Sequence, residues 1–121
     1  MKIKICGITE IETLNFLIEN GVDYVGFIFH ENSPRNVTHA FINEIKNIDF
    51  QKTRPVCVFV NPEKSFVNSS LSYFENPIIQ FHGDESEDFC RLFDCEFWKA
   101  LRIKDSKSLE DMKHFKNAQA I

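Results

Sequence analysis

The chain has 121 residues, of which 43% are hydrophobic and 26% are charged. This composition is typical of a folded globular domain and excludes a disordered chain. The formal net charge is −4 and no run of lysine or arginine occurs, so we expect no nucleic-acid partner. No apolar stretch approaches the length needed to cross a membrane, and the N-terminus has no leader-like segment. We therefore expect a cytoplasmic protein with no membrane partner.

The four cysteines show no paired spacing of the kind that holds a metal ion, so no metal site is expected; they are Cys6, Cys57, Cys90 and Cys95. Reduced thiols in a cytosolic protein explain them most simply.

Apolar segments typical of strands alternate with segments of helical spacing along the whole chain. The expected strands are 2–6, 22–29, 55–60, 78–82 and 97–103, and residues 118–121 resemble the start of a sixth. The expected helices are 10–20, 38–48, 62–74, 86–93 and 106–115. Five alternations at regular intervals predict a parallel α/β sheet, either open or part of a closed barrel.

Side chains at the segment boundaries predict how the helices begin and end. Thr9 is expected to cap the first helix, with Glu12 bonding back to the Thr9 amide, and Gly21 is expected to end that helix. Thr38, Ser86 and either Asp105 or Ser106 are expected at the starts of the second, fourth and fifth helices. Leu92 is expected on the apolar side of the fourth helix, and Leu109 and Met112 are expected to face inward from the fifth. Gly26 interrupts an apolar strand, which indicates that something packs closely against it.

Several polar side chains fall at the carboxyl ends of the expected strands, which is the edge where parallel α/β proteins bind ligands. Cys6 ends the first strand, Arg35 follows the second, and Gln80 and His82 share a face at the end of the fourth. A thiol, an imidazole and cations suit an anionic substrate and a proton transfer. The alternatives are a buried structural thiol, a structural histidine and a solvated arginine. Lys99 and Arg102 differ in parity, so the sequence does not decide which of them faces the pocket.

Six motifs, in this order, resemble the N-terminal part of the phosphoribosylanthranilate isomerase family. They are Lys4-Ile5-Cys6-Gly7-Ile8-Thr9, Gly21-Val22-Asp23 with Val25-Gly26-Phe27-Ile28-Phe29, Ser33-Pro34-Arg35, Val58-Phe59-Val60-Asn61, Gln80-Phe81-His82-Gly83-Asp84-Glu85 and Lys99-Ala100-Leu101-Arg102. The first and the fifth are highly specific. The resemblance implies a (β/α) TIM barrel, present here as one incomplete domain, 1–121, with about five βα units and the start of a sixth strand.

The resemblance also implies an activity, an aldose–ketose isomerisation in tryptophan biosynthesis. This is the Amadori rearrangement of N-(5′-phosphoribosyl)anthranilate to 1-(2-carboxyphenylamino)-1-deoxyribulose 5-phosphate, an intramolecular oxidoreduction that needs no cofactor or metal. Carried over residue by residue, Cys6 is the general base, Arg35 binds the anthranilate carboxylate, and Gln80 and His82 line the pocket. The expected partner is this small phosphorylated substrate.

The chain departs from the family pattern at its end. The family's general acid is an aspartate at the end of the sixth strand, and neither Asp105 nor Asp111, which precede that strand, takes its place. The loops that hold the substrate phosphate are also absent from these residues. We therefore expect this chain to be inactive alone and to self-associate through open sheet edges. The alternatives are a non-catalytic remnant that acts as a binding or scaffolding module, and an unrelated open α/β binding domain.

Overall fold

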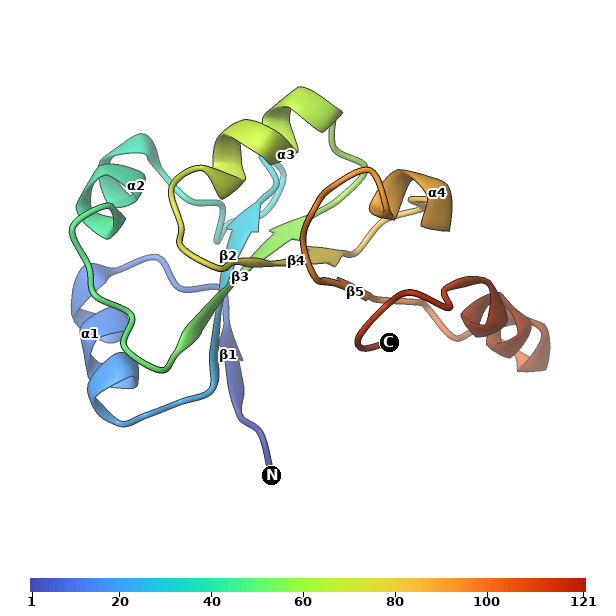
Figure 1. Cartoon of the computed structure of the whole chain (residues 1–121), viewed down its shortest axis with the longest axis horizontal. Coiled ribbons are helices and arrows are strands. Elements are labelled where there is room, and N and C mark those ends of the chain that lie inside the picture. Colours follow the sequence, from blue (N-terminus) through green and yellow to red (C-terminus); the bar gives the residue numbers. More distant parts are fainter.

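The computed structural model describes all residues from Met1 to Ile121 and contains one sheet of five parallel strands. The strands lie side by side in chain order, so each pairs with the one before it (Figure 1). They are β1 (Lys4–Cys6), β2 (Tyr24–Phe29), β3 (Arg54–Phe59), β4 (Ile78–Phe81) and β5 (Phe97–Lys99). Sequential order with helical crossovers is the pattern of a (β/α) barrel rather than of a doubly wound sheet, in which the order reverses.

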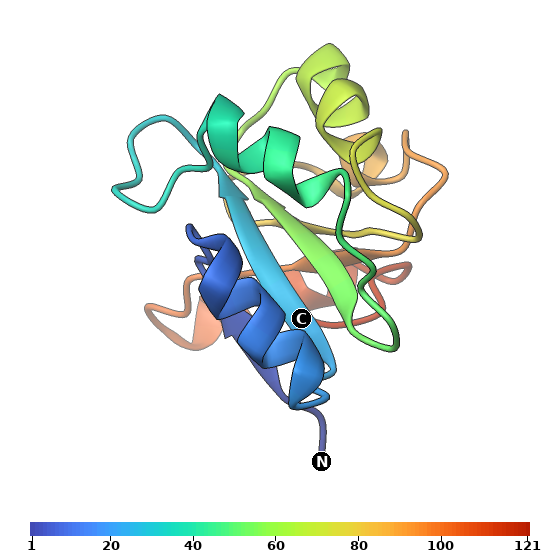
Figure 2. The ribbon, with the colours of Figure 1, turned by 90° about the vertical axis from the view of Figure 1, so that its left-hand side faces the viewer.

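A helical segment follows every strand. These segments are α1 (Ile11–Glu19), α2 (His39–Ile45), α3 (Lys64–Leu71), α4 (Glu87–Cys90) and the 3₁₀ helix η1 (Ser106–His114). Figure 2 shows α1 and α2 in front of the strands they cover, with α3 above them, so these three helices lie on one face of the sheet. Segment η1 lies beyond β5, at the opposite end of the molecule from α1 (Figure 1).

The expected sixth strand is present only as an isolated parallel bridge between Trp98 and Ala120. Backbone hydrogen bonds join Lys99 N to Ala120 O at 3.0 Å and Gln119 N to Phe97 O at 3.0 Å. The segment therefore continues the sheet beyond β5 in the expected direction. No strand pairing closes the sheet into a ring, because β1 has β2 as its only partner strand.

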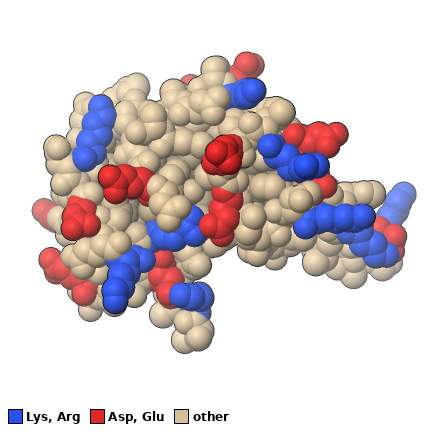
Figure 3. All heavy atoms as spheres, in the orientation of Figure 1, with Lys and Arg blue, Asp and Glu red and all other residues tan.

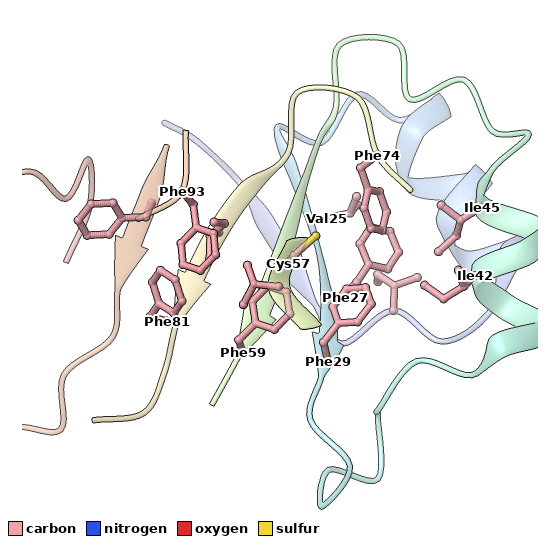
Figure 4. Close-up of a cluster of buried hydrophobic side chains, with 14 of the residues drawn as sticks. Val25, Phe27, Phe29, Ile42, Ile45, Cys57, Phe59, Phe74, Phe81 and Phe93 are labelled. Carbon is pink, nitrogen blue, oxygen red and sulfur yellow. The ribbon is translucent and has the colours of Figure 1, made fainter. Parts of the chain in front are cut away.

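The main hydrophobic core lies between the helices and the sheet face that they cover. It is rich in phenylalanine: Phe27 stacks on Phe74 with ring centroids 5.2 Å apart, and Phe29 stacks on Phe59 at 5.3 Å. Figure 4 shows Phe27 and Phe29 on β2 and Phe59 on β3. Phe74, from the segment after α3, and Ile42 and Ile45 of α2 lie on the Phe27 side of this cluster. The outward-facing positions of the strands supply eight of the 20 buried residues of this core, and the helices supply another eight, as expected for a sheet covered by helices.

The opposite, concave face carries a second, smaller cluster. Val56, Val58 and Ile78 are buried there, and the partly buried residues packed on them are Cys6, Tyr24, Ile28 and Trp98. The edge of the Tyr24 ring meets Trp98 with centroids 4.9 Å apart. Because Tyr24 lies on β2 and Trp98 on β5, the sheet must curl strongly, as a barrel wall does.

Three of the expected helix caps are confirmed. Thr38 accepts from Phe41 N at 3.2 Å, Ser86 from Phe89 N at 3.2 Å and Asp105 from Ser108 N at 2.9 Å. Gly21 ends the first helical segment with φ +68°, where its N–H donates to Ile18 O. The cap expected from Thr9 is wrong: α1 begins at Ile11, and its N-cap residue Glu10 makes no side-chain capping bond.

The second half of the chain has shorter elements than the periodicity predicts. Segment α4 ends at Cys90, and Leu92, expected on its apolar side, is exposed. The fifth helix is a 3₁₀ helix with no buried residue, so the inward placement of Leu109 and Met112 is wrong. Eclipsed i, i+3 side chains of a 3₁₀ helix do not form the broad apolar stripe assumed for an α-helix.

Charged side chains of both signs are interspersed on the face shown in Figure 3, without a continuous basic patch. No helix combines the length and apolar character needed to traverse a lipid bilayer.

Candidate functional site

Cys6 ends β1 on the concave face of the sheet, where its side chain is half-buried. Its register partner on β2 is Gly26. A Cβ placed on Gly26 would lie 2.7 Å from Cys6 Sγ and 3.1 Å from Cys6 Cα. Such distances are too short for nonbonded carbon and sulfur, so the missing side chain of Gly26 leaves the space that the thiol occupies. The close approach predicted from this glycine is confirmed.

The backbone turns sharply after the thiol. Gly7 has φ +82°, and the N–H groups of Gly7 and Ile8 both donate to Gly26 O, at 2.9 and 3.0 Å. This shared acceptor fixes the end of β1 against β2. The left-handed conformation of Gly7 favours glycine, because a Cβ there is strained.

Arg35 lies across Gly7. Its Nη1 donates to the carbonyl oxygen of Cys6 at 3.1 Å, and a Cβ on Gly7 would lie only 2.4 Å from that nitrogen. Nε and Nη2 of Arg35 have no hydrogen-bond partner within the chain. The guanidinium is therefore held at the end of β1, against the backbone of Cys6 and Gly7, with one edge of its planar fork available, an arrangement that suits a carboxylate.

Gln80 faces the same concave surface from β4. Its Oε1 accepts from Nζ of Lys4, a residue of β1, and this ammonium also lies 5.7 Å from the centroid of the Trp98 ring. The contact joins residues 76 positions apart in the chain. It places Gln80 on the same face of the sheet as Lys4 and Cys6.

His82 follows β4 and is exposed, and its N–H donates to Phe59 O at 2.8 Å. It lines a cleft of about 520 Å³ at the carboxyl ends of β3, β4 and β5. The other residues of this cleft include Asn61, Asp84 and Arg102. His82 thus lies at the predicted edge, but the cleft around it is formed by β3 to β5, whereas Cys6 and Arg35 lie at the ends of β1 and β2.

The ambiguity between Lys99 and Arg102 is resolved by β5. Trp98 faces the concave surface, and Lys99 therefore points to the other side, where its side chain is 1% exposed and pairs with Glu85 at 2.8 Å. Arg102 is exposed and lines the cleft with His82. Of the two cations, only Arg102 is available to a ligand at this edge.

The remaining cysteines lie in protected positions. Burial raises the pKa of the Cys57 thiol well above its ordinary value and raises the pKa of Cys90 to about 12. Burial also raises the pKa of Cys95, whose Sγ donates to Pro77 O at 2.9 Å. These three thiols stay protonated near neutral pH, so none of them is suited to act as a base.

A second cleft, of about 510 Å³, opens at the opposite edge of the sheet, between the segments that enter β3 and β4. Its lining includes Arg54 and Tyr73 but none of the predicted site residues. No group of three or more histidine, cysteine, aspartate or glutamate side chains is arranged to hold a metal ion.

Two site features were not predicted from the sequence. One is the Lys4–Gln80 contact across the concave face, and the other is the buried pair of Glu85 with Lys99. Each of these contacts joins residues of two different βα units. The alternation of side chains along a strand predicts which face a residue occupies, but it does not predict which residue of another strand it will contact. The only sequence signal for the second was Lys99, one of the two charged residues inside the expected apolar strand 97–103.

Comparison with known proteins gives a consistent result. The sequence profile of the N-(5′-phosphoribosyl)anthranilate (PRA) isomerase family matches residues 3–121. The chain is 38% identical over 117 residues to the N-(5′-phosphoribosyl)anthranilate isomerase of Geotalea uraniireducens, covering 97% of this chain and 58% of that protein. It is also 38% identical over 122 residues to the Legionella pneumophila (strain Paris) protein of that name, covering 100% and 59%.

Solved structures agree with these relatives. The phosphoribosylanthranilate isomerase of Thermotoga maritima superposes with a TM-score of 0.88 at 29% identity, over 99% of this chain and 60% of that one. A phosphoribosylanthranilate isomerase crystallised with reduced 1-(o-carboxyphenylamino)-1-deoxyribulose 5-phosphate gives the same TM-score and identity, over 99% and 63%. The chain thus spans a little under three fifths of the curated relatives named above. By sequence and by fold, it belongs to the phosphoribosylanthranilate isomerase family of (β/α) barrels.

Proposed function

We propose that this chain carries the base and the carboxylate-binding arginine of a phosphoribosylanthranilate isomerase site. In this proposal the thiolate of Cys6 removes the C2′ proton of the ring-opened Schiff base. The electron pair of that C–H bond moves toward the iminium nitrogen and leaves an enol, which becomes the ketone on reprotonation at C1′. Arg35 binds the carboxylate of the anthranilate ring, and Gln80 and His82 line the pocket.

The single observation that carries this proposal is the contact between Arg35 and the end of β1. Nη1 of the guanidinium donates to the carbonyl oxygen of Cys6, 3.1 Å away, so the two residues to which we assign carboxylate binding and proton abstraction meet at one strand end. A ligand carboxylate on the free edge of the fork therefore places the attached amine and sugar carbons near the thiol. Such pre-positioning is a major source of rate enhancement.

Opening the ribose ring needs an acid that protonates the ring oxygen. In the family this is an aspartate at the end of the sixth strand, which is not among these 121 residues. Asp105 caps η1 through Ser108, and Asp111 lies within η1 beside the His82 cleft. In this proposal these residues therefore supply the base and the carboxylate-binding arginine. The acid and the phosphate-binding loops come from the part of a family barrel that follows these residues.

An assay of phosphoribosylanthranilate turnover tests the proposal. We expect no turnover by the 121-residue chain alone, and turnover when it is mixed with the C-terminal part of the Geotalea uraniireducens relative that it does not match. In that mixture, Cys6→Ser is expected to lower kcat far more than it raises KM, because a hydroxyl is a poor base near neutral pH. Turnover by the chain alone contradicts the role of the missing acid, and a Cys6→Ser mixture of undiminished kcat assigns the base elsewhere.

A further inference from the structure

A buried ion pair lies behind the carboxyl-end loops, on the side of the sheet away from Cys6. Nζ of Lys99, the last residue of β5, lies 2.8 Å from Oε1 of Glu85, in the loop after β4. The two side chains are 1% and 2% exposed. Lys99 also donates to Gly83 O at 2.6 Å, and its ammonium lies 5.4 Å from the centroid of the Phe115 ring.

The carboxylate of Glu85 also binds two backbone N–H groups. Oε2 accepts from Asn61 N at 2.8 Å, and Oε1 accepts from Gly83 N at 2.9 Å. The amide oxygen of Asn61 in turn accepts from Asp84 N at 2.8 Å. One carboxylate therefore joins the loop after β3, the loop after β4 and the end of β5.

The backbone conformation at Asn61 and Gly83 allows these hydrogen bonds to form. Asn61 has φ +46°, in the left-handed region. A Cβ placed on Gly83 would lie 2.6 Å from Oδ1 and 2.9 Å from N of Asn61, so only glycine permits the two loops to approach this closely. No buried side-chain nitrogen or oxygen in the chain lacks a hydrogen-bond partner, so both charged groups of this pair are hydrogen-bonded.

A buried ion pair is a poor means of stabilising a fold. The loss of hydration of two charges largely cancels their attraction, and well-packed apolar side chains of similar volume often serve as well or better. What a fully bonded pair does provide is a fixed geometry, because moving either partner leaves a charge unsolvated and unpaired. The role of this pair must therefore be sought in the loops it holds.

His82 lies immediately before Gly83, and the cleft it lines is bounded by Asn61 and Asp84. We propose that Glu85 and Lys99 are positioning residues that set the place of His82 relative to the substrate, an inference that rests on the proposed function. Neither side chain reaches the cleft. They act through the backbone of Asn61 and Gly83, which they hold from behind.

Hydrogen exchange in the full 121-residue chain tests whether the pair fixes these loops. In Glu85→Gln, the replacement amide offers one oxygen where the carboxylate had two, so at least one of its three donors loses its acceptor. We expect the Asn61, Gly83 or Asp84 amides to exchange at least about tenfold faster, with unchanged exchange for central strand amides such as Val58. The matched control is Glu96→Gln, which breaks the half-exposed pair with Arg54 at the other edge of the sheet and should leave these amides unchanged.

Anthranilate is the probe for the effect on the site, and NMR amide signals are the readout. In the wild-type chain and in Glu96→Gln we expect it to shift the signals of Gly7, Arg35 and His82. In Glu85→Gln, the His82 response should be lost while Gly7 and Arg35 keep theirs. A purely structural pair would not produce this selective loss, because general destabilisation acts on all three alike.

Two results overturn the inference. One is wild-type exchange of the three loop amides in Glu85→Gln. The other is faster exchange with an undiminished His82 response, which makes the pair structural only. If anthranilate shifts no signal in the wild-type chain, the proposed function is contradicted. The exchange measurement remains independent of that result, since wild-type exchange in Glu85→Gln still refutes the role of Glu85 and Lys99 in holding the loops. Should Glu85→Gln fail to fold, Glu85→Gln with Lys99→Met removes both charges, leaves no unpaired ion, and gives the same readouts.

Discussion

The guanidinium of Arg35 crosses Gly7 and donates to the carbonyl oxygen of Cys6, which ties the loop after β2 to the end of β1. This contact has two requirements. The residue at position 7 must lack a side chain, and the cation must be long and planar enough to lie over the backbone. Both are met within two motifs that are 29 residues apart in sequence.

Replacement of Arg35 by lysine tests the planar fork. Lysine keeps the charge but offers no pair of parallel N–H donors, so Arg35→Lys is expected to weaken anthranilate binding by about 1–3 kcal/mol. Titration of the chain with anthranilate measures the change. An unchanged dissociation constant would place Arg35 on the solvated surface, with no part in binding.

Replacement of Gly26 by alanine tests the space beside the thiol. The added methyl group would meet Cys6 Sγ at 2.7 Å, so Gly26→Ala should displace the side chain and cost about 1–3 kcal/mol from overpacking. Denaturant unfolding and the rate of Cys6 alkylation measure the two effects. Gly21→Ala is the matched control, since no atom lies within 4 Å of its Cβ position and only its φ of +68° is strained. A normal alkylation rate in Gly26→Ala would show that the glycine is not needed there.

Alkylation of the wild-type chain should distinguish the four thiols. Cys6 is half-buried at the open concave face, whereas Cys57 and Cys90 are fully buried with raised pKa values. Because the thiolate is the reacting form, iodoacetamide at pH 8 is expected to modify Cys6 before either of them. Mass spectrometry of peptides from partly modified protein reads the order. Early modification of Cys57 or Cys90 would mean that the sheet opens readily in solution.

Acid is expected to release the segment after η1. Both the backbone N–H and the side-chain amide of Asn117 donate to Oε1 of Glu87, at 2.8 and 3.0 Å, and these bonds lower the pKa of Glu87 from its ordinary 4.5. A carboxyl with a lowered folded-state pKa stabilises the fold above its unfolded pKa and loses that effect as the pH falls through the folded value. The protection factor of the Asn117 amide, which compares its exchange rate with the intrinsic rate at the same pH, should therefore fall below about pH 4.5. Glu87→Gln should remove this pH dependence, and a persistent dependence would assign it to another group.

Local sequence determined the type and order of nearly every element. Apolar runs without helical polarity became β2 and β3, because strands covered on one face and curled on the other need apolar side chains in both directions. Thr38, Ser86 and Asp105 cap helices as expected, since a cap depends only on a side chain and an amide two or three residues away. Cys6 and Arg35 could be assigned to one edge because parallel strands present all their carboxyl ends together.

Only the tertiary structure decided which of these side chains meet and which face the inside of the protein. Lys99 was a candidate for the pocket, yet it is buried with Glu85 because the parity of β5 directs Trp98 to the concave face. The partner of Lys4 is Gln80, 76 residues away, and that pairing follows from the curl of the sheet. Leu109 and Met112 stay exposed because η1 is a 3₁₀ helix that buries none of its residues. Hydrophobic period and capping are encoded within one or two turns of chain, whereas register, curl and ion pairing depend on segments that are brought together only by folding.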